Sequence, residues 1–215
     1  MTIPQRITVK YFLEGANDLS LPAIVPVFQR WIQEHRVEGL LIDVADYKHV
    51  YEGPGVVLVG HEVDYAIDLA GGRPGLLHRR KRLLSDSAGE DSDPRLEEHL
   101  RKAMRSTLGA CQALSEEESL KGQIHFRTDE AEIAFPDRLR TPNQAETFEA
   151  LRGAIQEVLA ELYPGTKIEL ERVEGESRGP LTVHAKVPEA VELDRLVARI
   201  ESAPEKADFN SLKRD

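Results

Sequence analysis

Hydrophobic and polar residues alternate at the start of the chain and then change to a helical spacing. The apolar positions of residues 7–13 are Ile7, Val9, Tyr11 and Leu13. A period of two predicts a strand with one buried face. From Leu21 to Ile32 the apolar residues recur every three or four positions, between Ser20, a typical N-cap residue, and Gly39. This spacing predicts a helix whose first turn is bent by Pro26.

A long β-hairpin is predicted next. Residues 40–51 and 56–69 are rich in Val, Ile, Leu and Tyr, and the sequence Glu-Gly-Pro-Gly separates them. With Gly53 and Pro54 in the turn, the register pairs Tyr51 with Val56, His49 with Leu58, Tyr47 with Gly60, Asp46 with His61 and Asp43 with Asp64. One face of this hairpin is then almost wholly apolar, and the other gathers carboxylates and ring side chains.

The second half of the chain again alternates helix and strand signals. The predicted helices run from Asp93-Pro94 to Leu114, from Thr141-Pro142 to Leu162 and from Pro188 to Ser202, and the predicted strands are 123–127, 132–135, 166–173 and 181–187. Thr141-Pro142-Asn143-Gln144 has the spacing of a capping box, with proline at the first helical position. Cys111 lies on the apolar stripe of its helix, where we expect a buried side chain rather than a nucleophile.

These elements predict an α+β protein of two β-α-β-β halves, with mostly antiparallel sheets covered by helices. The separations from Ile42 to Val57 and from Ile168 to Val183 are both 15 residues. This match suggests an internal duplication with two similar sheets, and coincidence is the alternative because identity between the halves is low. The expected organisation is an N-terminal half with the hairpin, a polar linker, a C-terminal half and a flexible tail, at residues 1–84, 85–94, 95–203 and 204–215.

Composition and charge narrow the class of protein. The chain has 215 residues, of which 40% are hydrophobic and 31% are charged, as is typical of folded globular proteins. The net charge of −10 disfavours general affinity for nucleic acid or an anionic membrane, because phosphate binding needs many Lys or Arg contacts. No apolar run reaches the roughly 18 residues of a membrane span, and the N-terminus lacks a signal-peptide core. We therefore expect a cytoplasmic protein without membrane contact.

Three carboxylates of the predicted hairpin form a candidate metal site. Asp43, Glu62 and Asp64 lie on the same predicted face, with His49 beside them. Three acids within reach of one another repel unless a cation compensates them, and a hard divalent ion such as Mg²⁺, Mn²⁺ or Ca²⁺ takes oxygen ligands. The alternative is a solvated acidic face, and a register slip at Gly60 would turn these side chains apart.

Asp46 and His61 form a candidate catalytic pair on the other face. A carboxylate that accepts from an imidazole fixes its tautomer and raises its basicity, as a general base requires. The hairpin contains no serine or cysteine that would complete a nucleophilic triad,. A polar pair with a structural role is the alternative.

A basic cluster follows the hairpin and is the candidate ligand-binding site. Its cations are Arg73, Arg79, Arg80, Lys81 and Arg82, with Gly71, Gly72 and Gly75 beside them. Glycines leave backbone amides free to approach an anion, so a phosphate, a nucleotide or an acidic partner would fit a Gly/Arg-rich loop. Neither a P-loop nor a dinucleotide fingerprint is present. The alternative is that the acidic linker downstream neutralises the cluster.

The preferred interpretation is a cytoplasmic binding or assembly module that recognises an anionic small molecule or an acidic protein partner through the basic cluster. One alternative is a metal-assisted hydrolase that uses Asp43, Glu62 and Asp64 as ligands and His61 or His49 as the base. Another is a structural homodimer that associates through the hairpin residues Tyr47, Tyr51, Val56 and Leu58. The sequence leaves open whether the chain is an enzyme.

Overall fold

The structure is a computed structural model that describes residues 4, 6–15, 19–81, 96–175 and 179–203. Its strands are β1 (Ile7–Leu13), β2 (Leu41–Tyr47), β3 (Gly55–Gly60), β4 (Val63–Asp68), β5 (Gly75–Arg80), β6 (Phe126–Phe135), β7 (Glu169–Arg172) and β8 (Leu181–Lys186). Its α-helices are α1 (Leu21–Glu34), α2 (Leu96–Ser115), α3 (Ala145–Leu162) and α4 (Leu193–Ser202). Two short 3₁₀ helices are η2 (Ala70–Gly72) and η4 (Glu118–Leu120). The predicted linker 85–94 and tail 204–215 lie outside the described residues.

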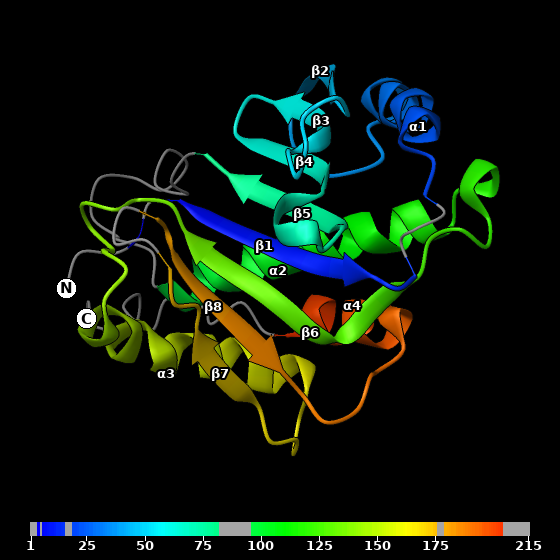
Figure 1. Cartoon of the computed structure of the whole chain (residues 1–215). Coiled ribbons are helices and arrows are strands. Elements are labelled where there is room, and N and C mark those ends of the chain that lie inside the picture. Colours follow the sequence, from blue (N-terminus) through cyan, green and yellow to red (C-terminus); the bar gives the residue numbers. More distant parts are fainter. Residues whose placement is uncertain (1–3, 5, 16–18, 82–95, 176–178, 204–215) are drawn as a thin grey trace, which may run out of the picture.

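The strands form one antiparallel sheet in the order β2-β3-β4-β5-β1-β6-β8-β7 (Figure 1). Strand β1 lies at the centre because it pairs with β5 on one side and with β6 on the other. Strands from both predicted halves therefore share a single sheet, in place of the two sheets expected. The mixed α+β class with antiparallel strands is confirmed. The internal duplication is not confirmed, and the division into domains stays a prediction.

The alternation in β1 separates the two faces of the sheet. Tyr11 lies on the helix side, where its hydroxyl is 4.0 Å from the Sδ atom of Met104 in α2. Helices α2 and α4 lie behind the sheet in Figure 1, with α1 near β2 and β3 and α3 near β7. We call the opposite side the outer face; in β1 it carries Thr8, Lys10 and Phe12. The outer face is where the polar residues discussed below come together.

The predicted hairpin is instead a three-stranded meander, and the predicted register is wrong. Residues 56–69 do not form one strand, because the chain reverses between β3 and β4 at His61 and Glu62. Added bulk at Gly60 would collide with the Val63 carbonyl oxygen, so glycine permits this tight reversal,. The β2–β3 connection is seven residues long, and the observed pairs are Tyr47 with Gly55, Asp46 with Val56 and Asp43 with Val59.

The prediction of a Gly/Arg-rich loop is also wrong for most of its length. Residues Gly75–Arg80 form β5, which pairs with β4 on one side and with β1 on the other. Within β5, His78 and Arg80 are buried while Arg79 is exposed. A strand turns successive side chains to opposite faces, so the basic residues cannot form one cluster. In β5 polar side chains occur on both faces, so the sequence lacks the apolar–polar alternation that predicts a strand.

The remaining elements differ from prediction mainly at their ends. Helix α1 ends at Glu34, because His35 takes a left-handed conformation with φ 52°. The two short strands predicted at 123–135 are one strand, β6. Helix α3 begins after Gln144 without a capping box, since the Thr141 hydroxyl donates to the Asp137 carbonyl. Helix α4 begins at Leu193, five residues after Pro188. Cys111 is buried as expected, and burial raises the pKa of its thiol.

Candidate functional site

The register of the sheet arranges the outer face in rows of side chains. One row runs from Arg79 in β5 to Thr8 in β1 and Ala134 in β6. The next row runs from Lys10 in β1 to Glu132 in β6 and His184 in β8. Side chains in one row of neighbouring strands lie within contact distance, so residues far apart in sequence meet here.

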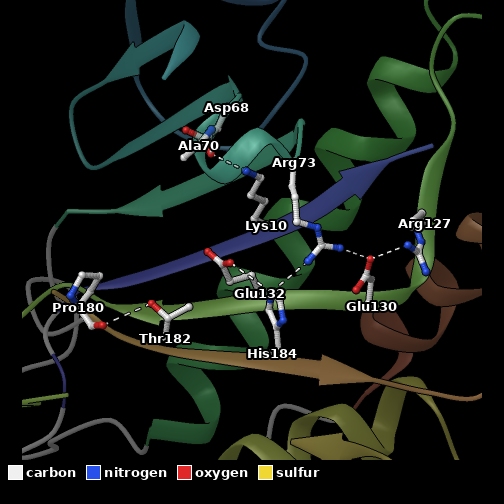
Figure 2. A network of polar contacts seen from close by, with 10 residues as sticks. All are labelled: Lys10, Asp68, Ala70, Arg73, Arg127, Glu130, Glu132, Pro180, Thr182 and His184. Carbon is white, nitrogen blue, oxygen red and sulfur yellow. Dashed lines mark hydrogen bonds and ion pairs between the residues drawn. The ribbon is translucent and has the colours of Figure 1, made fainter. Parts of the chain in front are cut away.

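A buried ion pair lies near the middle of the outer face (Figure 2). The Lys10 amine contacts the Asp68 carboxylate at 2.6 Å, and both side chains are at least nine-tenths buried. Asp68 also accepts a hydrogen bond from the backbone N–H of Ala70 at 3.3 Å. The pair therefore ties β1 to the start of η2. Removing one partner would leave a buried charge without compensation.

Arg73 extends from the end of η2 onto the centre of the sheet. Its guanidinium lies 3.7 Å from the ring centroid of Phe12, a cation–π arrangement. It also donates to the Glu130 carboxylate of β6. Arg127 contacts the same carboxylate at 2.8 Å, so Glu130 lies between two guanidinium groups. Arg73 thereby joins the β4–β5 connection to β1 and β6.

His184 completes this network from β8. Its Nε2 atom is 3.3 Å from Arg73 Nη1 and 3.4 Å from Glu132 Oε2. Its ring meets the edge of the Phe12 ring, with centroids 5.9 Å apart and planes at 87°. Figure 2 shows the imidazole pointing toward both charged groups.

The charges of this network compensate one another. Its permanent cations are Lys10, Arg73 and Arg127, and its carboxylates are Asp68, Asp129, Glu130 and Glu132. Three positive and four negative charges give −1 with His184 neutral. The network is therefore a poor general attractor for a free anion, although it contains Arg73 of the predicted basic cluster.

The other residues of the predicted basic cluster have separate environments. Arg80 is buried on the helix side. The Lys81 amine contacts Asp64 at 2.8 Å and donates to the Gly60 carbonyl. Arg82 lies outside the described residues. Arg79 is exposed on the outer face, and no ion pair links it to another described residue.

The three predicted metal ligands are separated. Asp43 in β2 and Asp64 in β4 lie on either side of Val59, and Glu62 is in the β3–β4 turn. Asp64 is held by Lys81 and by the Gly60 N–H, at 2.8 and 3.1 Å. Within the described part of the chain, no group of three His, Cys, Asp or Glu side chains could hold a metal ion.

The predicted catalytic pair is not formed in the observed register. Asp46 lies opposite Val56 and contacts the Lys48 amine at 3.0 Å. Hydrogen bonds from the Lys48 backbone and side chain lower the pKa of the Asp46 carboxyl. His61 is an exposed residue of the β3–β4 turn, and its backbone N–H donates to the Leu40 carbonyl. The role of the pair as acid and base stays a prediction without geometric support.

The helix side contains a polar cluster that sequence reasoning missed. His78 is completely buried beside Tyr65, with ring centroids 5.1 Å apart. Neither ring nitrogen has a hydrogen-bond partner among the described residues. Burial is the main cause that lowers the pKa of His78 to about 4. The imidazole is therefore neutral at pH 7, and its protonation opposes folding.

Glu38 lies near this cluster, and its carboxylate contacts Ser106 and Lys102 of α2. Burial raises the pKa of its carboxyl, but the hydrogen bond from Ser106 and the Lys102 ammonium more than offset this, so the pKa is lowered overall. The Tyr65 hydroxyl donates to the Glu38 carbonyl at 2.9 Å. The sequence does not predict this buried histidine, because His78 is followed directly by four basic residues and the whole run has the composition of an exposed segment.

The predicted dimer surface is only partly exposed. Tyr47 and Tyr51 are exposed, but Val56 and Leu58 have no exposed surface and belong to the core. Strand β2 is an edge of the sheet, and two features hinder the addition of another strand. The register is irregular between Leu41 and Asp43, and the Asp43 carboxylate accepts from the Val44 N–H at 2.8 Å.

Comparisons with protein-family models, with curated proteins and with solved structures found no significant match. Within the described residues, no helix is both long enough and apolar enough to cross a bilayer.

Proposed function

We propose that the chain is a binding or assembly module that recognises an anionic ligand or an acidic partner on the outer face of the sheet, with Arg79 as the principal contact. The observation that supports this proposal is the state of Arg79, an exposed cation without an ion-pair partner among the described residues. An exposed guanidinium offers several N–H donors in a fixed plane, which suits carboxylate and phosphate oxygens. A cytoplasmic location belongs to the same proposal.

The neighbours of Arg79 explain why its charge is available. Asp64 lies opposite Arg79 in the β4–β5 pairing, but its carboxylate already interacts with Lys81 and with the Gly60 N–H. Arg79 and Lys81 carry two positive charges against the one negative charge of Asp64, so this group of three residues has a net positive charge. The net charge of −10 opposes an approaching anion only weakly, because salt screens charges beyond about 8 Å at physiological ionic strength.

Replacing Arg79 with glutamine tests this proposal. We expect the variant to bind a fluorescein-labelled peptide of ten glutamates about 3 to 10 times more weakly, since one exposed charged hydrogen bond contributes on the order of 1 kcal/mol. Fluorescence anisotropy at physiological ionic strength, where salt screens the net charge of the chain, measures the affinity. The matched control is Arg195→Gln, which removes an exposed arginine of α4 and should leave the affinity unchanged.

Inorganic phosphate, added as a competitor, separates the two kinds of ligand. Displacement of the peptide by millimolar phosphate would indicate a small anion site, and resistance to phosphate would indicate a partner with several carboxylates. Equal affinities in the Arg79→Gln and Arg195→Gln variants would contradict the proposal, as would the absence of peptide binding by the unaltered chain.

A further inference from the structure

The Nε2 atom of His184 has two neighbours that require opposite protonation states. Arg73 Nη1, at 3.3 Å, is a donor that stays charged at any physiological pH,. Glu132 Oε2, at 3.4 Å, is an acceptor when the carboxylate is ionised,. A single ring nitrogen cannot accept from the first and donate to the second at the same time.

The partner of His184 therefore depends on its proton. When Nε2 carries a lone pair, it accepts from Arg73, and the Glu132 carboxylate gains no hydrogen bond from it. When Nε2 takes up a proton from solvent, it donates to Glu132, and the new positive charge repels the Arg73 guanidinium. Histidine is the ordinary side chain that changes charge between pH 5 and 8.

Several other charged groups surround His184, and none of them removes this conflict. They are Lys10 of β1, Glu130 of β6, Glu171 of β7 and Lys186 of β8. Lys10 is paired with Asp68, and Glu130 is shared by two arginines. Glu171 is the register partner of His184 on β7. Lys186 lies one row away, opposite Glu130.

Arg73 is the contact that joins the β4–β5 connection to the outer face. It follows η2 directly, stacks on Phe12 and donates to Glu130. The connection has few backbone hydrogen bonds of its own. Gly72 N donates to the Leu69 carbonyl at 3.2 Å, and Arg73 N donates to the Ala70 carbonyl at 3.4 Å. The two ends are fixed by hydrogen bonds from Leu69 N to the Gly53 carbonyl at 3.1 Å and from Leu13 N to the Pro74 carbonyl at 2.8 Å. Between them the local bonds are weak, so the side chain of Arg73 holds the middle of the turn.

We propose that His184 is a pH-dependent latch for the β4–β5 connection. The neutral ring with its proton on Nδ1 accepts from Arg73 and, together with Phe12 and Glu130, keeps residues 70–73 on the sheet. The protonated ring turns to Glu132 and removes this one contact, which loosens the connection. The inference depends on the geometry around Nε2 and is independent of the proposed anion binding at Arg79.

Amide hydrogen exchange tests the latch. We expect protection of the Gly72 and Arg73 amides, corrected for intrinsic exchange rates, to fall about tenfold between pH 7.5 and pH 5.5. In His184→Gln this fall should disappear, because glutamine can accept from Arg73 and donate to Glu132 without titrating. The control is His61→Gln in the β3–β4 turn, which should keep the full pH dependence.

A second variant separates a latch from a purely structural histidine. Glu132→Gln removes the negative charge that favours the protonated ring, so the loss of protection should move to lower pH. Constant protection of residues 72 and 73 across this range would overturn the proposal, as would an equal loss in unaltered chain and His184→Gln. An unchanged midpoint in Glu132→Gln would also overturn it.

Discussion

Replacing Leu58 with aspartate is expected to abolish folding. Leu58 of β3 has no exposed surface, and its side chain belongs to the hydrophobic core. The substitution loses the burial of a large apolar side chain, which costs about 2 to 5 kcal/mol, and it adds the cost of desolvating a carboxylate. The sum is comparable with the whole stability of a typical domain, about 5 to 15 kcal/mol. Circular dichroism and the yield of folded chain measure the effect.

The matched control for this substitution is Ile42→Asp on β2. Ile42 is 59% exposed, so the same chemical change should shift the melting temperature by only a few degrees. If Leu58 were instead part of a dimer surface, Leu58→Asp would give a folded monomer in light scattering. That result would contradict the observed core.

Acidification is expected to destabilise the chain through His78, and His78→Leu should remove this part of the pH dependence. The pKa of His78 in the folded chain is about 4, below the value near 6.5 of an unfolded histidine. The unfolded chain therefore binds the proton first. The stability associated with neutral His78 is complete above about pH 6.5 and falls as pH drops toward 4. The loss amounts to about 3 kcal/mol between pH 7 and pH 4.

Urea unfolding at these two pH values measures the contribution of His78. The difference in unfolding free energy between pH 7 and pH 4 should be about 3 kcal/mol smaller in His78→Leu than in the unaltered chain. His61→Gln, at an exposed histidine, should leave the difference unchanged. An identical pH dependence in His78→Leu and the unaltered chain would show that the buried imidazole is already charged or is reached by solvent.

Regular periodicity made several elements predictable from sequence. The strand 7–13 has the observed bounds of β1, because its alternation is uninterrupted and one face is wholly apolar. Helices α2 and α3 were found because their apolar stripes extend over four or more turns. Their ends were less predictable, since α3 begins after Gln144 and lacks the expected cap from Thr141.

The hairpin prediction is wrong because residues 56–69 contain two strands, β3 and β4, where the apolar pattern predicts one. Residues 56–69 are mostly apolar, and the short sequence Gly-His-Glu at 60–62 separates β3 from β4. A shift in register of this kind changes every cross-strand partner. The predicted meetings of Asp46 with His61 and of Asp43 with Asp64 were therefore lost together.

The candidate site was only partly accessible to sequence reasoning. Arg79 was among the predicted ligand residues, but its separation from Arg80 follows only when Gly75–Arg80 is recognised as a strand. The contacts among Arg73, Glu130 and His184 depend on β1 pairing with β6 and on β6 pairing with β8. The β1–β6 pairing joins residues more than 100 positions apart, as does the contact of Arg73 with His184. No local pattern specifies these meetings.

Mapping of amide chemical shifts during titration with the ten-glutamate peptide tests the central claim most directly. We predict that the shifted amides cluster around Thr8, Asp64 and Arg79 on the outer face, and that amides of α2, α3 and α4 stay in place. Shifts confined to the helices, or a spectrum unchanged at saturating peptide, would contradict recognition of acidic groups by this face of the sheet.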